Sequence, residues 1–357
     1  MPVYLDESPG GHDRFSRTQR DSTGELRVSA VRFVHVGLIN NMPDGALQAT
    51  ERQFLTLLGS ASDNLVVRLS LYSLPGIPRT GSGLCHANRF YSGIETLWDR
   101  RLDGLIVTGA DPHATRLEDE PYWGSLARVA DWAESNAHST VWSCLAAHAA
   151  VLHTDGIVRR RLSGKRFGVF ECARASDHHL TDGVAAPLGV PHSRWNDIPE
   201  KELTDRGYRV LLRSGDAGAD TFVKRRKSLF VFFQGHPEYD ANSLLLEYRR
   251  DVGRYLRHES TTYPPLPRGY FGRDTIDLLT ALRERTLSNR RIGSLAAFPT
   301  ALAEGGLSNL WRAAAVLVYR NWLAYLWTQK ERRSRERSVR NLCASGGQTY
   351  GPLVAGK

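Results

Sequence analysis

The stretch Thr140-Val-Trp-Ser-Cys-Leu-Ala-Ala147 decides the expected fold, because an apolar run passes into an alanine-rich run with a cysteine between them. The first half predicts a buried strand and the second half predicts a helix. A cysteine at such a strand-to-helix turn has its sulfur held clear of the sheet. The N–H groups that open the helix can lower the pKa of the thiol and hold a developing oxyanion. Cys144 is therefore a candidate nucleophile.

A second strand end, later in the chain, carries complementary groups. The run Leu229-Phe-Val-Phe-Phe233 predicts a buried strand, and the sequence Gln-Gly-His-Pro-Glu follows it directly. Within that sequence, His236 can act as a base and Glu238 can orient it. A buried core cysteine and a simple turn pair would explain each residue alone. Their combination with Cys144 instead predicts a nucleophilic triad for acyl transfer.

Strand and helix patterns alternate along the first half of the chain. Strands are predicted over 31–39, 65–71 and 103–108, and helices over 47–59 and 120–136. Apolar strands joined by helices predict an α/β fold with a doubly wound, mostly parallel sheet that is covered on both faces. Such sheets place their sites at the carboxyl ends of the strands. The residues at or just past these predicted ends are Asn40, Thr108, Cys144 and His236.

The second half of the chain is expected to be less regular. Shorter strands with some antiparallel pairing are expected over 197–233, and helices over 240–256 and 307–329. The tryptophan-rich part of the last helix is interpreted as core or subunit interface. The predicted organisation is a mobile leader (1–28), the principal α/β domain (29–262), a helical C-terminal region packed on it (263–333) and a basic, disordered tail (334–357).

Composition limits the classes of protein that the chain can represent. Its 41% hydrophobic and 24% charged residues are ordinary for a globular protein, and the net charge of +9 is concentrated in a basic run over 330–340. The four cysteines are widely spaced and the histidines lack metal-ligand spacing, so we expect a reducing cytoplasm and no metal site. The N-terminus is polar and no stretch is apolar enough to cross a membrane, so we expect no secretory signal, no membrane span and no nucleic-acid partner.

Several segments, in this order, resemble the homoserine O-succinyltransferase/O-acetyltransferase family, methionine-biosynthesis enzymes with a class I glutamine-amidotransferase-like fold. They are Ile39-Asn-Asn-Met-Pro-Asp-Gly45, Asp103-Gly-Leu-Ile-Val-Thr-Gly-Ala110, Lys165-Arg-Phe-Gly-Val-Phe170, Pro191-His-Ser-Arg194, Gly235-His-Pro-Glu-Tyr-Asp240 and Glu247-Tyr-Arg-Arg-Asp251. The resemblance covers 31–256. It implies an acyl-CoA:L-homoserine O-acyltransferase that works by a ping-pong route, as a cytoplasmic homodimer, without a cofactor other than acyl-CoA as co-substrate.

The resemblance also implies roles for single residues. Cys144 stands at the acyl-thioester cysteine, His236 at the general base and Glu238 at the group that orients the base. The positions of the amino-acid contacts are occupied by Lys165, Ser193 and Arg250. His113 stands where the family selects the acyl group, with glycine in succinyl-specific members and glutamate in acetyl-specific ones. A carboxylate there would repel the free carboxylate of a succinyl group. Its absence leads us to expect succinyl-CoA in preference to acetyl-CoA.

Three other functions remain open at this point. A glutamine amidotransferase-like hydrolase uses the same Cys-His-Glu chemistry, but it normally shows Gly-x-Cys-x-Gly, and Ser143-Cys-Leu-Ala146 lacks the second glycine. A diverged O-acyltransferase would accept serine or another hydroxy amino acid. A non-catalytic binding protein would engage an acidic partner through the basic C-terminus, and the intact triad argues against it.

Overall fold

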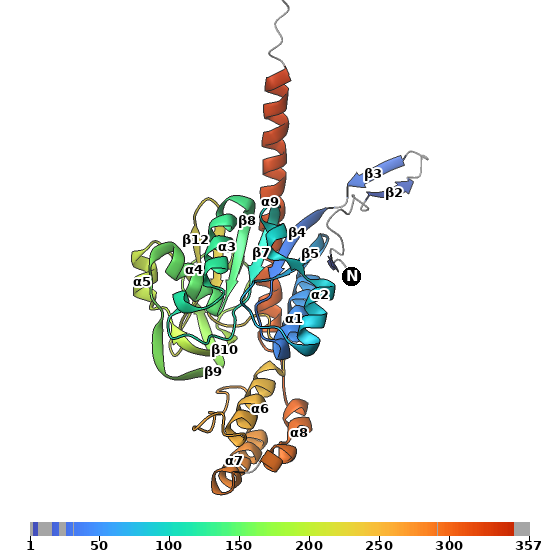
Figure 1. Cartoon of the computed structure of the whole chain (residues 1–357). Helices are drawn as coiled ribbons and strands as arrows, with labels where there is room; N and C mark the ends of the chain where they lie inside the picture. The colour runs from blue at the N-terminus through green and yellow to red at the C-terminus, as the bar shows by residue number, and fades with distance from the viewer. Residues whose placement is uncertain (1–2, 6–15, 21–25, 31, 291, 346–357) are drawn as a thin grey trace, which may run out of the picture.

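The computed structural model describes residues 3–5, 16–20, 26–30, 32–290 and 292–345 of the 357-residue chain. Its centre is one long sheet (Figure 1). In spatial order the strands are β1 (Val3–Leu5), β5 (Val66–Ser73), β4 (Phe33–Ile39), β7 (Leu102–Val107), β8 (Ala137–Ser143), β13 (Leu229–Phe233), β12 (Gly218–Arg225), β11 (Arg209–Ser214), β9 (Arg160–Arg174) and β10 (Leu188–Asp197). The short β6 (Ser92–Gly93) pairs with β5.

The direction of pairing changes once across the sheet. Neighbours from β1 to β13 pair in parallel, and neighbours from β13 to β10 pair antiparallel. The predicted α/β class with a mostly parallel sheet is therefore confirmed, and so is the antiparallel pairing expected over 197–233. The central parallel strands β4, β7, β8 and β13 consist almost wholly of buried residues, as strands covered on both faces do.

Helices cover both faces of the sheet. On one face α3 (Trp123–Asn136) and α4 (Leu145–Asp155) pack against the strands, and Leu126 and Val129 of α3 lie in the same core as Leu105 of β7. On the other face lie α1 (Asp44–Ala61) and α9 (Arg312–Ser345), with Phe54 and Trp322 in the same core as Ile106 and Val141. In a doubly wound arrangement of this kind, sites lie at the carboxyl ends of the parallel strands.

The long helix α9 lies close to the sheet because of a glycine in β7. A Cβ atom at Gly104 would lie 2.5 Å from Leu326 and 2.8 Å from Trp322, so only glycine allows this approach. The indole N–H of Trp322 donates to Ser139 of β8 at 3.0 Å. The helix continues to Ser345, so the predicted disordered tail of 334–357 begins inside a helix. The rest of that predicted tail, 346–357, lies outside the described residues.

A smaller helical part lies beyond one end of the sheet (Figure 1). It contains α6 (Ser243–Leu256), α7 (Arg273–Ser288), the 3-10 helix η4 (Ile292–Ala297) and α8 (Thr300–Gly305). Tyr248 of α6 and Leu279 and Leu282 of α7 share one core, to which Trp311 also belongs. The predicted boundary between 262 and 263 thus separates two helices that share a core. No helix was predicted from the sequence between 256 and 307. In α7 only Leu279, Leu282 and Thr286 are buried, so its apolar pattern is weak.

The remaining elements are short. They are α2 (Gly81–Phe90), α5 (Glu200–Asp205) and the 3-10 helices η1 (Ile94–Leu97), η2 (Leu117–Asp119) and η3 (His179–Thr181). Strand β2 (Ser16–Arg20) pairs with β3 (Leu26–Ala30), and β1 joins the edge of the main sheet. The segment interpreted as a mobile leader, 1–28, therefore contains strands where it is described, and its mobility stays a prediction. In the part of the chain that the structure covers, no helix combines the length and the apolar character that a membrane crossing needs.

Candidate active site

Cys144 occupies the turn between β8 and α4. Its backbone φ of 53° and ψ of −116° are values that residues other than glycine rarely adopt. The Cys144 N–H donates to the carbonyl of Phe233 at 2.8 Å, and the Cys144 carbonyl accepts from the N–H of Ala147 at 3.0 Å. The turn is therefore held from the neighbouring strand and from the helix. Strained backbone of this kind persists only where its surroundings fix it, and it is common at active sites.

His236 and Glu238 follow the strand next to the cysteine. Phe233 of β13 is in register with Ser143 of β8, so the two strand ends lie side by side. His236 Nδ1 lies 2.9 Å from Glu238 Oε1, and both side chains are buried. The His236 N–H donates to the carbonyl of Pro191 at 2.8 Å, which fixes the turn from strand β10. The three residues that the sequence predicted as a triad thus meet at one edge of the sheet.

The electrostatic environment favours a charged histidine. Burial alone would lower the pKa of His236, but the charges of Cys144 and Glu238 and hydrogen bonds to both raise that pKa well above 6.5. A protonated His236 stabilises a thiolate on Cys144, and the thiolate is the nucleophilic form of cysteine. By contrast, burial raises the pKa of the Cys172 thiol, which favours its unreactive protonated form.

Backbone N–H groups at the start of α4 lie beside the cysteine. The first N–H groups of a helix have no partner within the helix and attract negative charge. A Cβ atom at Gly109 would lie 3.1 Å from the nitrogen of Leu145, so glycine at this position avoids a tight side-chain contact with that nitrogen. Gly109 and Ala110 follow β7 and face the same cavity as Cys144. The Leu145 N–H can therefore stabilise an oxyanion formed by attack of the thiolate.

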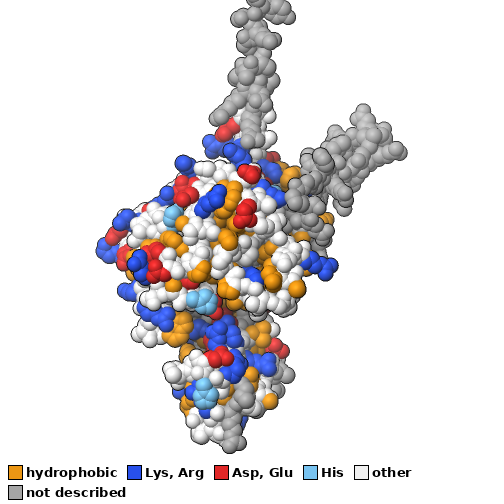
Figure 2. All heavy atoms as spheres, viewed as in Figure 1, with side chains coloured by type: hydrophobic (Ala, Val, Ile, Leu, Met, Phe, Trp, Pro, Cys, Tyr) orange, Lys and Arg blue, Asp and Glu red, His pale blue; other side chains and the backbone are white. Residues whose placement is uncertain are grey.

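Cys144 and His236 line a cavity of about 230 Å³ at the junction of the sheet and the smaller helical part. Figure 2 shows lysine and arginine side chains near this junction. The predicted residues that line the cavity are Cys144, His236, Glu238, Lys165, Ser193 and Arg250. His113 is exposed and is absent from the lining, and its N–H donates to Glu120 at 2.8 Å. Its part in choosing the acyl group stays a prediction.

Two acidic residues of α6 hold the three predicted substrate contacts together. Lys165 Nζ lies 3.0 Å from Asp251 Oδ2, and Arg250 Nε donates to Asp251 Oδ1 at 2.9 Å. Ser193 donates to Glu247 at 2.5 Å. Burial would raise the pKa of Asp251, but the charges of Lys165 and Arg250 lower it. Sequence analysis quoted Glu247 and Asp251 without a role, although their spacing of four residues places them on one helix face.

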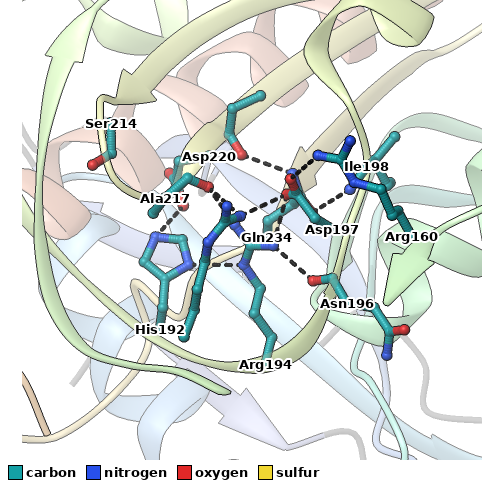
Figure 3. Close-up of polar contacts among 12 residues, drawn as sticks. Arg160, His192, Arg194, Asn196, Asp197, Ile198, Ser214, Ala217, Asp220 and Gln234 are labelled. Atoms are coloured by element: carbon teal, nitrogen blue, oxygen red, sulfur yellow. Dashed lines mark hydrogen bonds and ion pairs between the residues drawn. The ribbon is translucent and has the colours of Figure 1, made fainter. Parts of the chain in front are cut away.

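A buried polar network, drawn in part in Figure 3, contacts the residue before His236. Asp220 Oδ1 accepts the N–H of Gly235 at 3.0 Å, one residue before His236. Gln234 lies next to it, and its Oε1 lies 3.0 Å from His148 Nε2. Arg194 pairs with Asp197 at 2.8 Å inside the same network. Sequence analysis assigned these residues no role. The contact between Gln234 and His148 joins residues 86 positions apart, so no local pattern indicates it.

No metal centre is evident among the residues with described side chains, where no group of three or more His, Cys, Asp or Glu could hold an ion. The candidate reactive groups of the site are the cysteine, the histidine and the backbone amides around them.

A cysteine at a strained strand-to-helix turn, beside a buried His–Glu pair, defines a candidate cysteine-nucleophile site in an α/β protein. The comparisons with known proteins then identify the family. The chain belongs to the homoserine O-succinyltransferase family, whose model matches residues 22–333. The resemblance expected from the sequence is thereby confirmed.

Individual relatives are similar over most of their length. The chain is 46% identical to a homoserine O-succinyltransferase of Rhodopseudomonas palustris over 300 residues, which is 84% of this chain and 90% of the relative. It is 45% identical over 320 residues to the homoserine O-succinyltransferase of Bradyrhizobium japonicum, covering 89% and 94% of the two chains.

Solved structures with a related arrangement include glutamine amidotransferases. One from Methylobacillus flagellatus has a TM-score of 0.48 at 14% identity and covers 83% of this chain and 95% of its own. One from Thermotoga maritima has a TM-score of 0.43 at 13% identity, with 81% and 98% covered.

Proposed function

We propose that this protein is a homoserine O-succinyltransferase, which moves a succinyl group from succinyl-CoA to the hydroxyl of L-homoserine through a thioester on Cys144. The observation that carries the proposal is the placing of Cys144, the His236–Glu238 pair and the Lys165 cluster around one cavity. The names of the relatives support the succinyl donor and the homoserine acceptor.

In the first half-reaction the Cys144 thiolate attacks the carbonyl carbon of succinyl-CoA. A carbon–sulfur bond forms to Cys144, and the bond to the sulfur of CoA breaks. The oxyanion that forms in between lies next to the N–H of Leu145 at the start of α4. The departing CoA thiolate takes the proton from His236, whose charged form is favoured before the reaction.

The second half-reaction needs the opposite state of His236. The charge of Cys144 is one cause of the raised pKa, and acylation removes that charge. The pKa of His236 then falls, so the neutral imidazole can take the proton from the homoserine hydroxyl. The hydroxyl oxygen attacks the thioester, and Cys144 leaves as a thiolate. Glu238 keeps the imidazole oriented in both steps through its 2.9 Å contact with Nδ1.

The ion-paired cluster suits an amino acid, which carries both charges. Lys165 and Arg250 can bind the α-carboxylate, because a guanidinium presents paired donors to it. Glu247 and Asp251 can accept the α-ammonium, and they already pair with cations in the cluster. Bound homoserine would therefore replace some of the ion pairs that these four side chains form with one another. Serine is shorter by one methylene, so it would place its hydroxyl further from the thioester when held by the same groups.

The decisive experiment mixes the purified protein with succinyl-CoA or acetyl-CoA, each with homoserine, serine or no acceptor. We expect a burst of CoA release with succinyl-CoA alone, a succinyl group on Cys144 by mass spectrometry, and steady turnover with homoserine. A clear preference for acetyl-CoA would contradict the proposed donor, and turnover with serine alone would contradict the acceptor. Glutamine hydrolysis without acylation by either thioester would instead indicate an amidotransferase.

We also propose, from the family resemblance, that the enzyme is a cytoplasmic homodimer that needs neither metal nor cofactor. Light scattering of the purified chain should give twice the monomer mass, and dialysis against a chelator should leave turnover unchanged. A monomer with full activity would contradict the first expectation, and restoration of lost activity by a divalent cation would contradict the second.

A further inference from the structure

One cation on the cavity lining has no ion pair or hydrogen bond among the described residues. Five of the lysine and arginine side chains on its wall are engaged: Lys165, Arg250 and Arg254 in ion pairs, Arg194 with Asp197, and Arg161 on the ring of Trp195. Arg159 also lines the cavity. Among the residues whose side chains the structure describes, none gives Arg159 an ion pair within 4.0 Å or a hydrogen bond. A partly buried guanidinium in this state is costly unless an anion arrives.

Arg159 follows helix α4, whose N-terminal end lies next to Cys144. Helix α4 begins beside Cys144 and ends at Gly156, whose φ of 70° allows the chain to turn. The buried side chain of Ile157 anchors the segment that follows. Burial lowers the pKa of Arg159, whereas the charges of Tyr122, Glu120 and Cys144 raise it. Arg159 therefore lies close enough to the nucleophile to interact with its charge.

Glu120, an acidic residue whose charge acts on Arg159, already accepts hydrogen bonds from other groups. Glu120 Oε1 accepts the N–H groups of His113 and Ala114 at 2.8 Å each, which holds the loop after β7. Its Oε2 atom and the hydroxyl of Tyr122 are buried without a hydrogen-bond partner. Glu120 forms no ion pair with Arg159 within 4.0 Å among the described contacts. Its direct hydrogen bonds hold the loop, and it acts on the guanidinium only through its charge, without a direct contact.

We propose that Arg159 binds the terminal carboxylate of the succinyl group and so selects succinyl-CoA over acetyl-CoA. This inference rests on the function proposed above. Both acyl groups place a carbonyl carbon at the sulfur of Cys144, and only the succinyl group carries an anion at its far end. Arginine offers a carboxylate two parallel hydrogen bonds, which lysine does not. The side chain of His113 is exposed, whereas Arg159 lines the cavity that the acyl group must enter.

The test compares kcat/KM for succinyl-CoA and acetyl-CoA in Arg159→Met, which keeps an unbranched, flexible side chain and removes its charge. The succinyl-to-acetyl ratio should fall by about tenfold or more, because the variant loses hydrogen bonds between charged groups. Arg159→Lys should keep part of the preference. The matched control is Arg161→Met, which removes a nearby cation that stacks on Trp195, and its ratio should equal that of the wild type.

If a variant is inactive, a binding measurement can take the place of the kinetic comparison. Free succinate should slow alkylation of Cys144 by iodoacetamide in the wild type more than acetate does, and Arg159→Met should lose this difference. An unchanged donor ratio, or equal loss with both donors, would overturn the inference and leave Arg159 a structural role beside Glu120 and Tyr122. Failure of the wild type to acylate Cys144 with succinyl-CoA would instead overturn the proposed function, and the inference with it.

Discussion

The cations that line the cavity are held in two ways. Beside α6, Lys165 and Arg250 are paired with Glu247 and Asp251, and we call this cluster the α6 wall. Arg159 lines the same cavity and has no such ion pair among the described residues. A cluster of balanced charge suits a zwitterionic amino acid, and a cation without an ion pair suits an anion. Under the proposed function we therefore expect the two substrates to bind at different cations, and variants of each group test that expectation.

The largest expected effect comes from Cys144, which takes part in both half-reactions of the proposed mechanism. Cys144→Ala should reduce turnover on the order of 10⁴-fold or more, because both half-reactions pass through its sulfur. The fold should survive, as judged by circular dichroism. Mass spectrometry of the wild type after incubation with succinyl-CoA should find the acyl group on Cys144 and not on Cys85, Cys172 or Cys343. Cys85→Ala, which removes an exposed thiol, is the control that should retain activity.

The next largest effect concerns the base and the group that orients it. His236→Asn should lower kcat by about 10²–10⁴-fold, which is the usual contribution of a general base. Glu238→Gln should cost less, because the carboxylate orients the imidazole and stabilises its cation without moving a proton itself. Steady-state kinetics would measure both changes. A harmless Glu238→Gln would mean that another group, such as Ser143, orients the histidine.

How much of this could be predicted from the sequence depends on how far apart the interacting residues lie. The turn at Cys144 and the His236–Glu238 pair follow from short apolar runs that end in reactive residues, so they were predictable from local patterns. The α/β sheet was predictable for the same reason. The pairing of Lys165 with Asp251 joins β9 to α6, and no local pattern indicates it. Arg159 has no ion pair or hydrogen bond among the described residues, and this too becomes evident only from the folded cavity.

Variants of the α6 wall should separate the two half-reactions. Lys165→Ala and Arg250→Ala should each lower kcat/KM for homoserine by about 10- to 100-fold, since each removes hydrogen bonds to a charged group. Acylation of Cys144 by succinyl-CoA should persist, because the proposed role of Lys165 and Arg250 is to bind the amino acid. Rapid-quench mass spectrometry can measure the acylation rate directly. An equal loss in the acylation step would show that these residues do not act on the acceptor alone.

A pH titration should reveal the coupling between cysteine and histidine. The charges of Cys144 and Glu238 raise the pKa of His236 against the lowering effect of burial. Removing either charge should therefore move the pKa of His236 downward in Cys144→Ala and in Glu238→Gln. NMR titration of the imidazole C–H signals would measure the shift. A higher pKa in either variant would contradict the ion-pair state and its change upon acylation.

The smallest expected effect comes from His113, which the family resemblance marks as the acyl-selective position. A His113→Glu variant should move the donor ratio toward acetyl-CoA, because the new carboxylate repels the succinyl end. Its side chain is exposed, and exposed charge pairs are worth about 0.2–1 kcal/mol, so we expect a change of about fivefold at most. Measured kcat/KM for both donors would show it, and His113→Gln is the uncharged control. The shift should also shrink at high ionic strength, because solvent-exposed charges are screened.

The size of that shift decides between two accounts of donor choice. Glu120 holds the backbone of His113 and Ala114, and the side chain at 113 is exposed and does not belong to the cavity lining. If His113→Glu changed the ratio more than Arg159→Met does, the side chain at 113 would have to turn inward when acyl-CoA binds. Selection would then rest on repulsion from the loop rather than attraction by Arg159. A smaller change that disappears at high ionic strength would instead support Arg159 as the group that recognises the succinyl carboxylate.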